Sequence, residues 1–133
     1  MDAAPATATA LADLMEISSQ VEAAVVLDAD GSILGSTLAD EAAAERLARA
    51  GRELLEETAT GIPHAGGAVT QIEASLREGS LFVARDGLRT IVGRTTPHPT
   101  SGLVLYDLKT CLRALEQTPP KPRARKRKAA ADA

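Results

Sequence analysis

Residues 21–37 read VEAAVVLDADGSILGST and contain two apolar, β-branched stretches separated by Asp30-Gly31. The first stretch, residues 21–28, is nearly all apolar, which is typical of a strand covered on both faces. Asp-Gly is a strong signal for a tight hairpin turn of type I′, because that turn needs positive φ angles. The segment therefore predicts a β-hairpin, with residues 32–37 as its second strand.

Helices are predicted on either side of this hairpin and at the end of the domain. Residues 8–19 and 102–117 have apolar side chains at helical spacing. Residues 41–60 form the longest predicted helix, with Asp40 as its N-cap and Gly61 as its stop signal. One face of the long helix carries an apolar stripe rich in small residues, and the other face is densely charged. The stripe consists of Ala44, Leu47, Ala48, Gly51, Leu54, Leu55 and Thr58.

Three more strands are predicted after the long helix, as a meander of hairpins. They span residues 68–76, 80–85 and 88–95, with short connections at Gly79 and at Asp86-Gly87. The first of them alternates Gln71, Glu73 and Ser75 with apolar residues, so one of its faces lies in water. If this strand is a sheet edge, its unpaired backbone groups are a template for strand addition by a partner.

The order is helix, two strands, helix, three strands, helix. Short hairpins imply a single sheet, and the apolar first and fourth strands imply helices on both of its faces. We therefore expect an α/β (α+β) domain, a five-stranded antiparallel sheet between helices. The domain is expected at residues 8–117, after a disordered N-terminus at 1–7 and before a disordered basic segment at 118–133.

Composition excludes several classes of protein. Aromatic residues make up only 2% of the 133 residues, which argues against stacking surfaces for bases or sugars. The single cysteine excludes a disulfide framework and a multi-cysteine metal site within one chain. The sequence shows neither an apolar run of about 20 residues, as a membrane span requires, nor a signal peptide. We expect a cytoplasmic protein.

The candidate catalytic residues do not form a recognisable constellation. His64 and His98 each adjoin a proline in a predicted loop, where solvent-exposed imidazoles are the simpler interpretation. Cys111 lies on the apolar stripe of the last helix, whereas a reactive thiolate needs an electropositive, partly open site. The glycine-rich segment 64–67 lacks the Gly-Lys-Ser/Thr ending of a phosphate loop and precedes a strand. No catalytic residue, cofactor or metal is expected, and the chain is not predicted to be an enzyme.

Three segments, together with the order of elements, resemble the roadblock / dynein light chain family, including its bacterial MglB type. The segments are VVLDADGSIL at 25–34, GGAVTQIEASLREGSLFVAR at 66–85 and GLVLYDLK at 102–109. The resemblance covers residues 8–117 and implies a fold similar to profilin and longin domains. It also implies a homodimer, or a heterodimer with another roadblock protein, built through the second helix and third strand. The implied role is a scaffold or regulator of a Ras-like small GTPase in a bacterial signalling set, where some relatives raise GTP hydrolysis without inserting a catalytic residue.

This resemblance places two surfaces on the sequence. The expected dimer interface comprises Ala44, Leu47, Ala48, Gly51, Leu54, Leu55, Thr70, Gln71, Glu73 and Ser75. The expected GTPase platform comprises Glu45, Arg49, Arg52, Glu53 and Glu56. From the residues alone, Gly51 allows close approach either by a partner's helix or by the chain's own sheet. No residue is assigned as an arginine finger.

A basic tail lies outside the family pattern. Its cations are Lys121, Arg123, Arg125, Lys126, Arg127 and Lys128. With Asp132 the segment 121–133 carries a formal charge of +5, whereas residues 1–120, with nine basic and seventeen acidic side chains, carry −8. The alternative function is therefore a dimerising module whose tail binds nucleic acid, an anionic membrane or an acidic protein. Two simpler interpretations are a solubilising tail and a tail that folds back on its own acidic domain.

Overall fold

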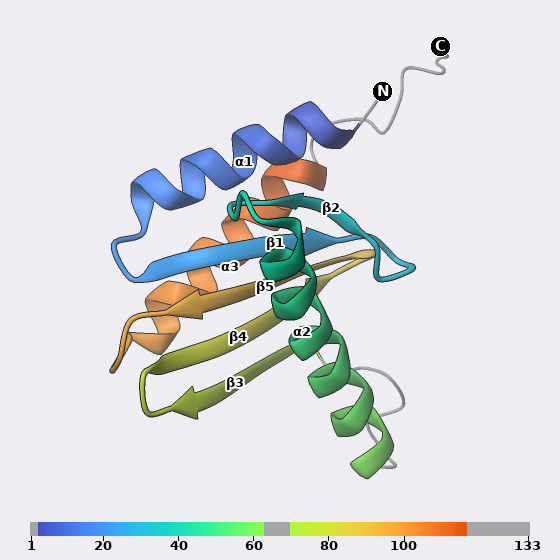
Figure 1. The fold of residues 1–133 in the computed structure, drawn as a ribbon, viewed down its shortest axis with the longest axis vertical. Helices are drawn as coiled ribbons and strands as arrows, with labels where there is room; N and C mark the ends of the chain where they lie inside the picture. The colour runs from blue at the N-terminus through green and yellow to red at the C-terminus, as the bar shows by residue number, and fades with distance from the viewer. Residues whose placement is uncertain (1–2, 63–69, 117–133) are drawn as a thin grey trace.

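A five-stranded antiparallel sheet lies between helices in the computed structural model, which describes residues 3–62 and 70–116 (Figure 1). The strand order is β2-β1-β5-β4-β3, so β1, β5 and β4 are central and β2 and β3 are the edges. The elements are α1 (Ala3–Ile17), β1 (Val21–Leu27), β2 (Ile33–Ser36), α2 (Glu41–Gly61), β3 (Gln71–Leu76), β4 (Gly79–Asp86), β5 (Arg89–Thr95) and α3 (Ser101–Glu116). Helices α1 and α3 cover one face of the sheet and α2 crosses the other (Figure 1). The predicted fold class is confirmed.

The sheet separates two apolar clusters, one on each face. Alternate residues of a strand point to opposite faces, so Val26 packs in the cluster beneath α1 and α3 and Val25 packs in the cluster beneath α2. Both valines are fully buried. The continuous apolar sequence of β1 is thus explained by helices on both of its faces.

Helix α1 begins at Ala3, five residues before the expected start, so residues 3–7 of the N-terminus predicted to be disordered are helical, and residues 1 and 2 lie outside the described residues. The physical reason is packing of the early turns of α1 on the edge strand β2. Thr7 is fully buried, and a Cβ added to Gly35 of β2 would lie 2.5 Å from its Cγ2 atom. Gly35 therefore allows the helix to approach the sheet closely.

The β1–β2 turn is a hairpin, as expected, but it is not of type I′. Gly31 has a φ of 87°, whereas Asp30 does not have the positive φ that a type I′ turn also requires. The amide of Gly31 donates to the carbonyl of Asp28 at 3.0 Å, and the Asp28 carboxylate accepts from the amides of Asp30 and Ser32. The Asp28 side chain therefore fixes a longer turn, in which only the glycine is left-handed.

The predicted start of α2 is confirmed, because the Asp40 carboxylate accepts a hydrogen bond from the Ala42 amide at 3.1 Å. Residues 68 and 69, predicted as the start of the third strand, lie outside the described residues, and β3 begins at Gln71. The other element bounds differ from the predicted ones by one or two residues. Within the described ranges, no helix is long and apolar enough to cross a membrane.

Candidate interaction surface

The small-residue stripe of α2 packs against the chain's own sheet. Ala44, Leu47, Ala48 and Gly51 are all buried in the isolated chain. A Cβ added to Gly51 would lie 2.3 Å from Cγ2 of Val92, which shows how closely the helix approaches β5. We expected these four residues in a dimer interface. In the isolated chain its own sheet covers them, because that is the close approach Gly51 permits.

A different side of α2 carries apolar residues that remain partly exposed. Ala43, Ala50 and Leu54 are half-buried and lie on one side of the helix, because positions 43, 47, 50 and 54 repeat at intervals of four and three. Leu54 and Leu55 also contact the core cluster beneath α2. Ala43 and Ala50 were not among the predicted interface residues, although their spacing relative to Leu47 and Leu54 could have indicated them.

The outer edge of β3 is unpaired among the described strands. The carbonyl of Thr70 accepts from the Arg85 amide of the neighbouring strand at 2.8 Å. Because backbone groups of successive residues in an antiparallel strand point to opposite sides, Gln71, Glu73 and Ser75 direct their amides and carbonyls away from β4. The edge position of this strand is confirmed.

The side chains of these edge residues lie on the α3 face of the sheet. The Ser101 hydroxyl donates to the Glu73 carboxylate at 2.7 Å, and the Lys109 ammonium donates to the Gln71 side-chain carbonyl. These contacts hold the exposed strand against α3. The side chains of the edge strand are thus bonded to α3, and its outward backbone groups remain open to a partner strand.

The predicted platform on α2 divides into two groups. The guanidinium of Arg52 donates to the Gly31 carbonyl at 2.8 Å and forms an ion pair with Glu45. These two residues tie α2 to the β1–β2 turn. Arg49, Glu53 and Glu56 are exposed, so they remain accessible to a partner.

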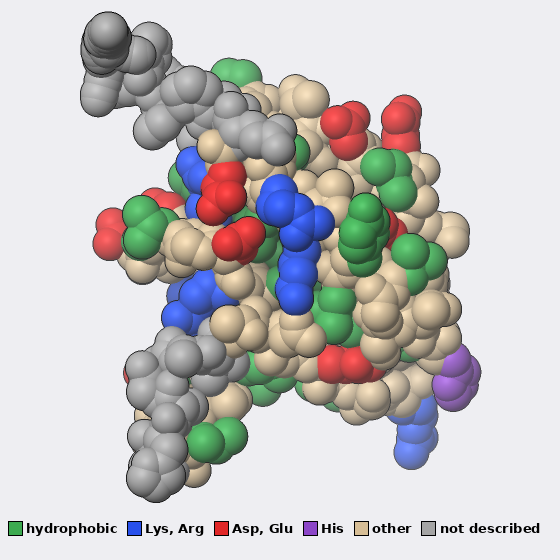
Figure 2. All heavy atoms as spheres, turned by 180° about the vertical axis from the view of Figure 1, so that it is seen from behind, with side chains coloured by type: hydrophobic (Ala, Val, Ile, Leu, Met, Phe, Trp, Pro, Cys, Tyr) green, Lys and Arg blue, Asp and Glu red, His purple; other side chains and the backbone are tan. Residues whose placement is uncertain are grey.

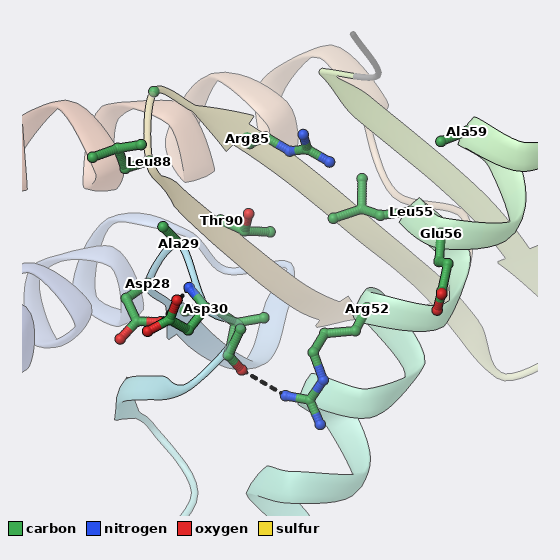
Figure 3. A pocket seen from close by; sticks show the side chains of 13 residues that line it. Asp28, Ala29, Asp30, Arg52, Leu55, Glu56, Ala59, Arg85, Leu88 and Thr90 are labelled. Atoms are coloured by element: carbon green, nitrogen blue, oxygen red, sulfur yellow. Dashed lines mark hydrogen bonds between the residues drawn. The ribbon is translucent and has the colours of Figure 1, made fainter. Parts of the chain in front are cut away.

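A hollow of about 440 Å³ lies between α2 and the β1–β2 and β4–β5 turns. Figure 3 shows Arg52 reaching across it from α2 to the carbonyl of the turn. Its lining mixes carboxylates, guanidinium groups and apolar side chains, and includes Asp28, Asp30, Glu56, Arg85, Leu55 and Leu88. Leu88 is 78% exposed at the rim. This hollow could not be predicted from the sequence, because its walls come from segments far apart in the chain.

The candidate catalytic residues lie apart from the hollow, as far as the structure describes them. The lining of the hollow contains no His, Cys or Ser among the residues described. Burial and the charge of Asp13 raise the pKa of Cys111 to about 11, so its thiol stays protonated near neutral pH. His98 lies exposed in a loop at a φ of 56°, and no group of three or more potential metal ligands occurs within the described ranges. His64 and the six tail cations lie outside them.

Comparison of the structure with solved structures identifies its fold. A roadblock/LC7 domain from Streptomyces avermitilis superposes with a TM-score of 0.70 at 18% identity, over 80% of this chain and 91% of that one. The gliding protein mglB from Thermus thermophilus superposes with a TM-score of 0.71 at 16% identity, over 86% and 89% of the two chains. The chain has the roadblock fold. A second roadblock/LC7 structure from the same Streptomyces species gives a TM-score of 0.62 at 22% identity.

Of the three comparisons with known proteins, only that with solved structures finds a match. No protein-family model matches the sequence. No curated protein matches it either. Since the identities to the solved roadblock domains are 16–22%, the likeness establishes the arrangement of helices and strands.

Proposed function

We propose that the chain is a non-enzymatic, dimeric scaffold or regulator that binds a Ras-like small GTPase. The observation that carries this proposal is the open, oriented edge of β3 in a roadblock fold. The resemblance of residues 8–117 to the roadblock family supplies the expected class of partner. The charged, exposed residues of α2 supply a surface for it.

In the proposed dimer, β3 of one copy pairs with β3 of the second copy across a two-fold axis. A two-fold interface brings the same residues together from both copies, so the outward backbone groups of Gln71, Glu73 and Ser75 hydrogen-bond to their equivalents. The half-buried side of α2 at Ala43, Ala50 and Leu54 would supply apolar contact. This assignment replaces the buried stripe of α2 as the helical part of the interface.

The proposed GTPase contact uses the exposed residues Arg49, Glu53 and Glu56 of α2. Arg52 is unsuited to insertion into a partner's active site, because its guanidinium is bonded to Gly31 and Glu45. We therefore propose that the chain acts by binding and positioning the GTPase, without supplying a group to GTP hydrolysis.

The dimer is tested with Glu73→Pro, which removes an outward amide without touching the pairing with β4. We expect the wild-type chain to be a dimer in multi-angle light scattering and the variant to be a monomer with unchanged circular dichroism. Glu73→Gln is the matched control, because it loses the carboxylate bonded to Ser101 and keeps the amide. A monomeric wild type, or a Glu73→Pro variant that stays dimeric, contradicts the proposed interface.

The partner is tested by affinity purification of the full chain from its native lysate, followed by mass spectrometry. We expect a small GTPase that persists at moderate salt, is lost with Arg49→Glu, and is kept with the control Arg77→Glu in the exposed β3–β4 turn. Replacing the tail cations by glutamine should leave that GTPase bound. If the wild type instead retains nucleic acid or anionic lipid that salt removes, and the tail variant does not, the function belongs to the tail.

A further inference from the structure

A second, smaller cavity lies between α1 and α3, on the face of the molecule opposite α2. It has a volume of about 120 Å³. Its walls are Ala10, Asp13, Leu14 and Ile17 of α1 and Asp107, Thr110, Cys111 and Ala114 of α3. Figure 2 shows this face, on which hydrophobic side chains gather beside acidic ones. We call this cavity the α1–α3 groove.

Asp107 in this groove is a buried carboxylate without a partner. The residue is 8% exposed. Within residues 3–62 and 70–116, no hydrogen bond or ion pair reaches its carboxylate. Burying a charge is costly unless it is paired, so this position favours a cationic donor that enters the groove.

A cation adjoins the groove without lining it, because the Arg113 guanidinium donates to the hydroxyl of the wall residue Thr110 at 3.3 Å. Asp13 supplies a second carboxylate to its lining, and the described lining includes neither Lys nor Arg. The charge of Asp13 also contributes, after burial, to the raised pKa of Cys111, another residue of the lining. Two carboxylates beside Leu14 and Ala10 suit a Lys or Arg side chain, whose apolar stem packs on the leucine while its charged end meets the acids.

We propose that the basic tail docks in the α1–α3 groove of its own chain, with Lys121 or Arg123 bonded to Asp107 and Asp13. The tail leaves the fold at Glu116, the last residue of α3, and α3 forms one wall of the groove. Asp107 lies nine residues earlier, about 13.5 Å back along the helix. The five residues from Glu116 to Lys121 span at most about 18 Å, so both cations reach the groove without strain on the fold.

Charge and tethering favour this occupant. The tail carries six cations, and the described domain has an excess of acidic side chains. The larger hollow beside α2 is a poorer acceptor, because Arg52 and Arg85 line it. A groove of this size holds only one side chain, so the contact by itself is weak. The short tether compensates, because it gives the tail a millimolar effective concentration at the groove. Docking would also occupy cations that a polyanion would otherwise bind.

Zero-length crosslinking of the full chain with a carbodiimide tests the proposal. The chain contains four lysines, and only Lys109 precedes the tail. We expect an amide between Lys121 and the exposed carboxylate of Asp13, located by mass spectrometry of tryptic peptides. Mixing ¹⁵N-labelled and unlabelled protein shows whether the two residues belong to one chain.

The Asp107→Asn variant tests the role of the buried carboxylate. We expect the Lys121–Asp13 product to fall about tenfold, the effect of losing one charge-assisted hydrogen bond. Glu78→Gln, an equal change of charge in the β3–β4 turn, should leave the yield unchanged. The proposal is overturned if the tail crosslinks mainly to Asp28, Asp30 or Glu56, or if the Lys121–Asp13 product joins two chains. It is also overturned if Asp107→Asn leaves the yield of this product unchanged, or if no such product forms.

Discussion

Replacing Gly51 by alanine tests the closest contact between α2 and the sheet. The added Cβ would lie 2.3 Å from Cγ2, 2.9 Å from Cγ1 and 3.2 Å from Cβ of Val92. Val92 is fully buried and β-branched, so its side chain has no free rotamer to adopt. The helix and β5 must therefore move apart locally, by about 1 Å to restore an ordinary contact distance of 3.4 Å.

Two opposing effects set the size of the change in stability. Alanine is favoured over glycine inside a helix by about 1 kcal/mol. Inserting a methyl group into a packed core costs about 1–3 kcal/mol. Because three atoms of one rigid side chain lie too close, we expect the upper part of that range. The free energy of unfolding should then fall by about 1–2 kcal/mol.

The assay is urea denaturation followed by far-ultraviolet circular dichroism, since the chain has no Trp and a single Tyr. Protein concentration is held constant because the proposed dimerisation would make stability concentration-dependent. Gly102→Ala is the matched control, because a Cβ on Gly102 in the first turn of α3 meets nothing within 4 Å. We expect this control to be neutral or to stabilise the protein by up to about 1 kcal/mol.

A double-mutant cycle identifies the cause. Val92→Ala removes the methyl groups that the new Cβ meets, so Gly51→Ala should cost at least about 1 kcal/mol less in that background. If Gly51→Ala raises the stability of the wild-type chain by about 1 kcal/mol, as at an open helical site, the inferred contact with Val92 is refuted. Equal effects in both backgrounds would refute it as well.

Three further results are expected. Asp40→Ala should lower the free energy of unfolding by about 1 kcal/mol by removing the N-cap of α2, and Asp40→Asn should restore most of it in urea denaturation. Arg52→Ala should lower the free energy of unfolding by no more than about 1 kcal/mol, because the Arg52 side chain is a third exposed. The same variant should speed amide hydrogen exchange at Gly31, whose carbonyl loses the bond to Arg52. The pKa of Cys111 is about 11 in the folded chain against 9.0 for a free thiol, so its stabilising contribution is complete below pH 9. This contribution to the free energy of unfolding is lost as the pH rises from 9 to 11, because the unfolded chain releases the thiol proton at a lower pH than the folded chain does. Cys111→Ala should therefore lose stability less steeply with pH over this range.

The strands and helices could be predicted because their signals are local. The apolar run of residues 21–28 needs cover on both faces, and the alternation at Gln71, Glu73 and Ser75 gives one wet face; the structure shows both features. The N-cap at Asp40 depends only on the next two residues. The start of α1 was missed because small, polar residues near Thr7 carry no strong helical pattern, and contact with β2 holds them.

The candidate surface was predicted less well, because apolar spacing shows that a helix buries a face without showing what covers it. The stripe through Ala48 and Gly51 fits a partner's helix and the chain's own sheet equally well as a pattern. Only the approach of α2 to Val92 decides for the sheet. The same limit applies to Arg52, whose bond to Gly31 joins residues 21 positions apart.

By itself, the sequence determined the order of elements, the antiparallel hairpins, the two-sided cover of β1 and the contrast between an acidic domain and a basic tail. These follow from short-range periodicity, turn residues and charge. The tertiary structure alone decided which side of α2 stays exposed, how the hollow beside Leu88 is formed, and that Asp107 is buried beside α1. Those properties depend on contacts between residues distant in the chain, which only packing brings together.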